Sequence, residues 1–148
     1  TACLHNHSGD DMTASSHVIA ALLRGFDPDA LGAYIDPGHM TVEGGRSGWK
    51  IGMDAVHDRI RMMALKDFGW YRNEADGQVT WAEKLVPLSE GIVRWDEVFE
   101  CLAAIDFDGV VSFHSEYQGG HSWRDLDTDG VIAQTREDYA YMRARLAR

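Results

Sequence analysis

Four short apolar stretches follow one another along the chain, and a segment with apolar residues at helical spacing lies after each of them. The stretches, which we predict to be strands, are residues 2–7, 31–35, 60–65 and 110–113. The predicted helices cover about residues 12–24, 49–58, 95–104 and 128–148. Because strands that alternate with helices at this spacing form βα units, the pattern predicts an α/β fold with a parallel sheet.

Four βα units are half of an eight-stranded (β/α)8 barrel. We therefore expect residues 1–148 to be a single domain of the TIM-barrel type that supplies about four of these units. A small doubly wound sheet is the alternative, but no glycine-rich phosphate-binding sequence follows any predicted strand. The chain starts at Thr1, without a methionine, and enters a strand almost at once, so we expect a fragment or a processed product.

The composition narrows the classes of partner. Hydrophobic residues at 45% and charged residues at 26% are ordinary for a globular protein, while the net charge of −10 argues against nucleic acid or an anionic membrane as a partner. No apolar run approaches the ~20 residues that a membrane span needs, and we find no signal peptide. Cys3 and Cys101 lie far apart in apolar surroundings, which favours buried free thiols and a cytoplasmic location over a disulfide.

Polar side chains that can bind metal follow the predicted strands, at the ends where a TIM barrel has its active site. These residues are His5, His7, Asp36, Lys66, His114 and Glu116. The period-2 alternation of a strand places them on the face that would point into the barrel. Imidazole and carboxylate groups suit divalent cations such as Mn²⁺, Zn²⁺, Co²⁺, Fe²⁺ or Mg²⁺. We expect Asp36 and Glu116 to bind one such cation, with His5 or His7 as a third ligand.

Each of these residues also has a purely structural interpretation. His5 and His7 could form a hydrogen-bonded pair, and Asp36 could cap the turn that follows it. His39 could be a surface turn residue, Lys66 could belong to a structural ion pair, and Glu116 could be a solvated loop acid.

A long polar segment between the third strand and the third helix is predicted to be a loop. It runs from Phe68 to Pro87 and contains Trp70, Tyr71 and Trp81. Loops of this length in compact domains are usually lids or binding loops. We therefore expect Trp70 to contact the substrate.

Five short motifs occur in an order that resembles a known family. They are residues 4–7 (LHNH), 35–39 (IDPGH), 65–68 (LKDF), 87–91 (PLSEG) followed by Trp95, and 115–117 (SEY). Together they resemble the C-terminal half of the xylose isomerase-like TIM-barrel superfamily, the sugar phosphate isomerase/epimerase group, over nearly the whole chain. The resemblance implies a divalent metal held by side chains from the fifth to the eighth strand of the barrel.

The resemblance also assigns roles to single positions. Asp36 matches the aspartate ligand of the sixth strand, Glu116 the glutamate ligand of the eighth, and His39 the histidine that contacts substrate. Two positions depart from the pattern. His5 stands where many members have a glutamate, and Ala64 stands where many have a histidine ligand, so His7, His114 or Lys66 would have to compensate.

The function implied is that of an enzyme on a small carbohydrate, sugar phosphate or polyol. It would be an isomerase or epimerase that abstracts a proton next to a carbonyl, with His39 as base or substrate contact and Lys66 as stabiliser of the oxyanion. His7 and His114 would contact the substrate.

The alternatives are a lyase or dehydratase of the same superfamily, and a non-catalytic carbohydrate-binding protein without metal. The superfamily's DNA-repair endonucleases need a basic surface, which the acidic composition disfavours. The expected partner is the N-terminal half-barrel or a second subunit.

Overall fold

The computed structural model describes residues 1–146 and divides into two compact units. The first unit consists of Thr1–Leu65 and Val93–Phe113, and the second of Lys66–Ile92 and the residues from His114 onward. Arg148, expected at the end of the last helix, lies outside the described residues. Among the described residues, no helix is long and apolar enough to cross a membrane.

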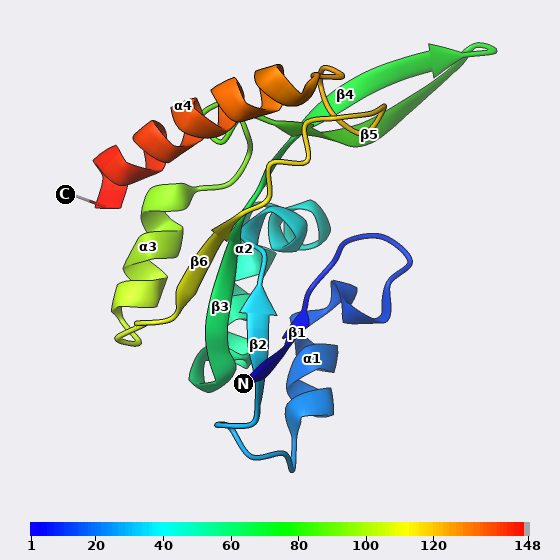
Figure 1. Ribbon diagram of the computed structural model, residues 1–148. Coiled ribbons are helices and arrows are strands. Elements are labelled where there is room, and N and C mark those ends of the chain that lie inside the picture. The colour runs from blue at the N-terminus through cyan, green and yellow to red at the C-terminus, as the bar shows by residue number, and fades with distance from the viewer. Residues whose placement is uncertain (147–148) are drawn as a thin grey trace. The chain divides into compact units, whose positions relative to one another are not determined.

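A four-stranded parallel sheet forms the centre of the first unit (Figure 1). The strands, in their order across the sheet, are β1 (Ala2–His5), β2 (Leu31–Ile35), β3 (Ile60–Leu65) and β6 (Val110–Phe113). All four predicted strands are thus confirmed, although β1 ends two residues before His7. A parallel sheet with helical crossovers confirms the expected α/β class.

Alternate residues of the sheet supply the hydrophobic core of the first unit. Ala33 and Ile35 of β2 and Met63 and Leu65 of β3 are each no more than 2% exposed. The core is completed by apolar residues of the helices, namely Ile19, Leu23, Met53, Val98 and Leu102. Tyr34, on the opposite face of β2, is only half-buried. One face of β2 and β3 is thus packed in the core, whereas the opposite face is covered unevenly, since Ala64 there is 0% exposed.

The first unit contains three α-helices, α1 (Ser16–Leu23), α2 (Pro37–Ala55) and α3 (Trp95–Ala103). Two short 3₁₀ helices, η1 (Met12–Ala14) and η2 (His57–Arg59), precede α1 and β3. Asp11 begins η1 by accepting a hydrogen bond from the backbone N–H of Thr13 at 2.8 Å. The predicted helix at residues 12–24 is therefore present, but Ser15 divides it into two pieces.

Helix α2 begins twelve residues before the helix that we predicted at about residues 49–58. The helix begins at once after β2 because Asp36 is its N-cap and Pro37 occupies the first turn, where proline costs no hydrogen bond. It is kinked at Gly45, whose φ of 59° and ψ of −148° are accessible almost only to glycine. The glycines thus bend a helix that Asp36 and Pro37 have already started.

The second unit contains a β-hairpin where we expected a loop. Strands β4 (Asp67–Ala75) and β5 (Gln78–Val86) pair antiparallel. The turn is Asp76-Gly77, with φ values of 52° and 73°. Two positive φ values are typical of the type I′ turn that joins hairpin strands, for which Asp-Gly is a preferred sequence. The loop prediction was wrong because this turn signal was passed over.

The last helix, α4 (Thr128–Leu146), is joined to the rest of the second unit by a buried polar network. The carboxylate of Asp138 accepts hydrogen bonds from the Tyr117 hydroxyl at 2.6 Å and from the Leu88 backbone N–H at 3.0 Å. Burial and this carboxylate raise the pKa of Tyr117, so its hydroxyl stays protonated and donates. Asp138 therefore connects three segments distant in sequence.

The two cysteines are free thiols within the described residues, as expected. Both Cys3 and Cys101 are partly exposed, however, rather than buried. Cys3 lies on β1 at an edge of the sheet, and no further neighbouring strand covers it among residues 1–146.

Candidate active site

The backbone around Asp36 is fixed by the side chain of Asn6. The carboxamide oxygen of Asn6 accepts a hydrogen bond from the Asp36 N–H at 2.6 Å, and its Nδ2 donates to the Asp36 carbonyl at 3.2 Å. Asn6 is 1% exposed, so this double contact is shielded from water. Sequence reasoning missed Asn6, and its place between two histidines at a strand end was the available signal.

The two carboxylate oxygens of Asp36 have different surroundings. Oδ1 accepts a hydrogen bond from the backbone N–H of His39 at 3.1 Å, which caps helix α2. Oδ2 is buried and has no hydrogen-bond donor among residues 1–146. It lies 3.6 Å from Nε2 of His5 and 3.7 Å from Nε2 of His39. Asp36 does cap the turn, as its structural interpretation held, but this uses only one oxygen.

A buried carboxylate oxygen without a donor is costly unless a positive charge satisfies it. Two imidazole nitrogens lie within 4 Å of Asp36 Oδ2, and imidazole nitrogens bind divalent cations when they are neutral. His5 Nε2 and Asp36 Oδ2 are close enough to be ligands of one ion. The chemistry of this donor set fits a divalent cation.

His39 is a buried residue, which contradicts its interpretation as a surface turn residue. It is 3% exposed, and its ring lies 4.1 Å from that of His7, centroid to centroid. Its Nδ1 is hydrogen-bonded to the Ser8 hydroxyl at 2.8 Å. With Nδ1 held by Ser8, Nε2 is the atom that faces Asp36. Ser8 was also missed, since nothing in the sequence distinguished it from an ordinary turn serine.

In the second unit, Glu116 contacts two of the other predicted site residues. Its Oε2 accepts a hydrogen bond from the Lys66 ammonium at 2.9 Å, and its Oε1 lies 3.6 Å from Nδ1 of His114. Lys66 is only 3% exposed, whereas half of the Glu116 side chain is exposed. Lys66 therefore forms an ion pair, as its structural interpretation held, and its partner is Glu116.

The sequence also singled out two further positions, Trp70 and Ala64, which are not among these acids and histidines. Trp70, expected in a binding loop, lies on strand β4 and is 45% exposed. Ala64 is fully buried in β3, and its methyl group cannot bind a metal.

Comparison with known proteins agrees with this architecture. The sequence profile of the family described as "Xylose isomerase-like TIM barrel" matches residues 1–145. No curated protein matches the chain. Several solved structures do match the chain. A D-psicose 3-epimerase crystallised in the presence of D-fructose is 17% identical with a TM-score of 0.67, and the match covers 97% of this chain and 48% of that one.

Two further structures extend the comparison. A xylose isomerase-like TIM barrel protein from Mycobacterium smegmatis in complex with magnesium is 14% identical with a TM-score of 0.65, covering 98% of this chain and 44% of that one. A probable 3-DHS dehydratase from Bacillus anthracis is 20% identical with a TM-score of 0.58, covering 90% and 47%. The chain thus spans about half the length of these proteins, and at these identities the likeness concerns the fold.

Four parallel strands in chain order, helical crossovers between them and a profile match over almost the entire sequence lead to one assignment. The chain belongs to the xylose isomerase-like TIM barrel family.

Proposed function

We propose that the protein is part of a metal-dependent isomerase or epimerase that acts on a small carbohydrate. The observation that carries the proposal is the second carboxylate oxygen of Asp36, which is buried, lacks a hydrogen-bond donor among the described residues and faces two imidazoles. Epimerases among the structurally similar proteins support the reaction class.

The proposed cation ligands are Asp36, Glu116 and His5, with His7 as an alternative third ligand. Asp36 directly follows β2 and His5 ends β1, and these strands are neighbours in the sheet. Glu116 comes three residues after β6. A bound Mn²⁺, Zn²⁺, Co²⁺, Fe²⁺ or Mg²⁺ would polarise the substrate carbonyl as a Lewis acid. Magnesium in the similar Mycobacterium smegmatis protein supports a cation of this kind.

The proposed chemical step is the transfer of a proton from the carbon next to the substrate carbonyl. His39 takes the proton on Nε2, and the C–H electron pair forms a carbon–carbon double bond while the carbonyl oxygen becomes an oxyanion. Lys66 stabilises this oxyanion with its ammonium group. Protonation of the same carbon by solvent on the opposite face, while His39 releases its proton to solvent, re-forms the carbonyl and gives the epimer. Return of the His39 proton to the former carbonyl carbon gives the isomer, with the proton of the neighbouring hydroxyl passing to the oxyanion. His7, His114 and Trp70 would contact the substrate.

Two alternatives start from specific observations. The dehydratase among the similar structures favours a lyase, in which the same proton abstraction is followed by loss of a hydroxyl group. Ala64, whose methyl group cannot bind a metal and which stands where the resemblance places a histidine in many members, favours a carbohydrate-binding protein without metal.

Deuterium uptake tests the proposed reaction. The protein would be incubated in D₂O with D-fructose, D-tagatose or D-psicose and Mn²⁺, and exchange of the carbon-bound hydrogen would be followed by NMR. We expect exchange with at least one sugar, and its loss on addition of a chelator. Exchange that persists with the chelator contradicts metal dependence. Binding of these sugars without any exchange would favour the non-catalytic alternative.

A further inference from the structure

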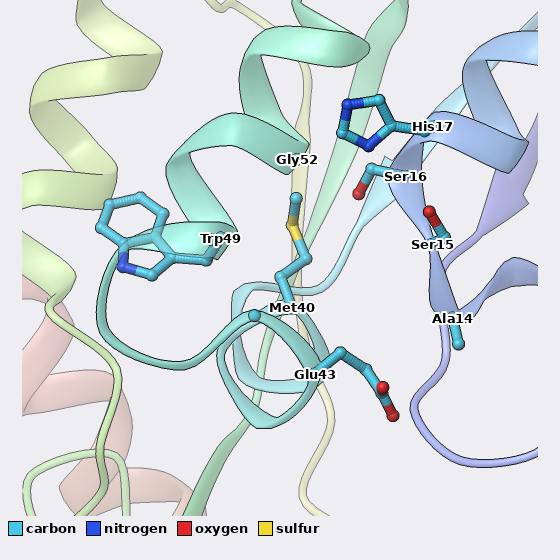
Figure 2. A pocket seen from close by; sticks show the side chains of 10 residues that line it. Ala14, Ser15, Ser16, His17, Met40, Glu43, Trp49 and Gly52 are labelled. Atoms are coloured by element: carbon cyan, nitrogen blue, oxygen red, sulfur yellow. The ribbon is translucent and has the colours of Figure 1, made fainter.

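A cavity of about 280 Å³ lies in the first unit between the start of helix α1 and the kinked helix α2 (Figure 2). It is lined by Ala14, Ser15, Ser16, His17, Met40, Glu43, Gly44, Gly48, Trp49 and Gly52. None of these residues belongs to the proposed metal and proton-transfer machinery. The volume is roughly that of nine water molecules in the bulk liquid, so a monosaccharide-sized molecule is the appropriate scale.

Hydrogen-bonding groups at one wall of the cavity are not used within the described part of the chain. Ser15 is the N-cap of α1 but makes no side-chain capping bond, and the backbone N–H groups of Ser16 and His17 have no backbone acceptor among residues 1–146. Ser16 as a residue is only 7% exposed, but its hydroxyl oxygen is not among the fully enclosed side-chain atoms that lack a partner in the described chain. Figure 2 shows this hydroxyl directed toward Met40, between the two helices. A hydroxyl that reaches this space can exchange hydrogen bonds with a ligand there, as can the two N–H groups at the start of α1.

The opposite wall is shaped by three glycines spaced four residues apart on α2. A Cβ atom at Gly52 would lie 2.9 Å from both the Ser16 hydroxyl oxygen and the Met40 methyl carbon. At Gly48, by contrast, a Cβ atom would meet nothing within 4 Å, because the cavity opens there. Any side chain at Gly52 would crowd Ser16, and a long side chain at Gly48 could enter the cavity.

The charge of the lining distinguishes between classes of ligand. Glu43 contributes a carboxylate, and none of the ten lining residues is a lysine or an arginine. Together with the net charge of −10, this disfavours a phosphate or another anion, despite the helix N-terminus. A neutral molecule with several hydroxyl groups matches better. Its hydroxyls can donate to Glu43 and accept from the N–H groups of α1, while its C–H groups contact Met40 and the glycine surface.

We propose that this cavity is a second binding site, selective for a small neutral polyhydroxylated molecule such as a polyol or a monosaccharide. The site is connected to the candidate active site through Glu43. Oε1 of Glu43 accepts a hydrogen bond from the Gly9 N–H at 2.7 Å, and the neighbouring Ser8 holds Nδ1 of His39 at 2.8 Å. A ligand that engages Glu43 therefore acts on the turn that fixes the His39 ring.

The binding test uses D-sorbitol as the probe and NMR signals of the His17 ring and the Trp49 indole as local reporters. We expect saturable shifts of both signals in the purified 148-residue protein, with or without a chelator. Ser16→Ala should weaken binding about three- to tenfold through the loss of one hydrogen bond. Gly48→Leu should abolish the shifts by filling the cavity. Ser47→Ala, an exposed neighbour that does not line the cavity, should leave binding unchanged.

Three outcomes would overturn the proposal. They are the absence of saturable shifts in the unmodified protein, shifts that survive Gly48→Leu, and tighter binding of inorganic phosphate than of sorbitol. Circular dichroism of each variant establishes that it keeps its fold. Ser16→Ala removes only one oxygen atom, so it provides a second test if Gly48→Leu perturbs the helix.

Discussion

At the scale of single residues, Asp36 combines a structural task with a proposed chemical one. Its Oδ1 caps helix α2, and its Oδ2 is left in a buried position against His5 and His39. The cap fixes the direction in which Oδ2 points, so the start of the helix positions the proposed metal ligand.

Asp36→Asn separates these two tasks. The amide oxygen can still accept the hydrogen bond that caps α2, but the negative charge and the second oxygen are lost. We expect Mn²⁺ affinity to fall by more than the roughly 10–100-fold that changes outside the ligand shell cause. Metal content after dialysis, measured by mass spectrometry, is the readout. Asp54→Asn makes the same charge change at an exposed position of the same helix and should keep the metal. Equal metal content in both variants would contradict the proposed ligand role.

Asp138 gives a prediction on pH dependence. Burial raises its pKa above the ordinary value of 3.8, although the hydrogen bonds from Tyr117, Leu88 and Gln134 act in the opposite direction. With a raised pKa, the folded protein retains this proton at pH values where the unfolded chain has lost it. The contribution to stability is therefore complete below the unfolded pKa and is lost as pH rises through the folded one.

Asp138→Asn removes this titration while keeping a polar group of similar size. The free energy of unfolding of the unmodified protein, minus that of the variant, should decrease as pH rises above 3.8 and then level off. Urea denaturation at a series of pH values measures this difference. A difference that is constant or that increases with pH would show that the pKa of Asp138 is not raised in the folded protein.

At the scale of secondary structure, the hairpin depends on the Asp76-Gly77 turn. Gly77 has a φ of 73°, a conformation that costs a residue with a Cβ atom about 1–2 kcal/mol. We expect Gly77→Ala to destabilise the hairpin by about this amount and to speed hydrogen exchange of the β4 and β5 amides. Gly120→Ala is the control, since Gly120 has an ordinary φ and open space around it, and it should change little. Equal exchange in both variants would be evidence against the turn assignment.

The elements show what the sequence could and could not predict. The apolar strands β2, β3 and β6 were identified with the bounds that the structure gives, because continuous apolar runs are typical of strands in parallel sheets. Helix α2 was missed over its first half because its glycines have a low helix propensity, whereas the start signal of Asp36 and Pro37 prevails locally.

The candidate site was predictable to a similar degree. The acids and histidines at strand ends stand out in the sequence, and His5, His7, Asp36 and His39 do lie together in the first unit. Asn6 was marked only by its place between two histidines at a strand end, and Ser8 was marked by nothing in the sequence. Their roles depend on hydrogen bonds across 30 and 31 positions of the chain, which no local pattern records.

At the scale of the whole molecule, the parallel sheet has two open edges within the described residues, at β1 and β6. On β6, Val110 is 59% and Val111 is 39% exposed. Unpaired edges with exposed valines are sites for further strands. We therefore expect the isolated chain to associate with a second copy or with an N-terminal half-barrel.

Light scattering on the purified 148-residue chain measures this association. Val110→Lys, which places a charge on the edge strand, should reduce the associated fraction. Val18→Lys, at an exposed valine of helix α1, should not. A cooperatively unfolding monomer with no partner would show that the half-barrel interpretation is wrong.

The proposed function requires that a divalent cation binds at the buried oxygen of Asp36. Crystals of the protein grown with Mn²⁺ and measured at the manganese absorption edge test it most directly, because the anomalous signal locates the ion itself. We predict an anomalous peak at bonding distance from Asp36 Oδ2, with His5 and Glu116 among the other ligands. A well-ordered map with no peak there, or with Asp36 Oδ2 hydrogen-bonded to a protein donor instead, would contradict it.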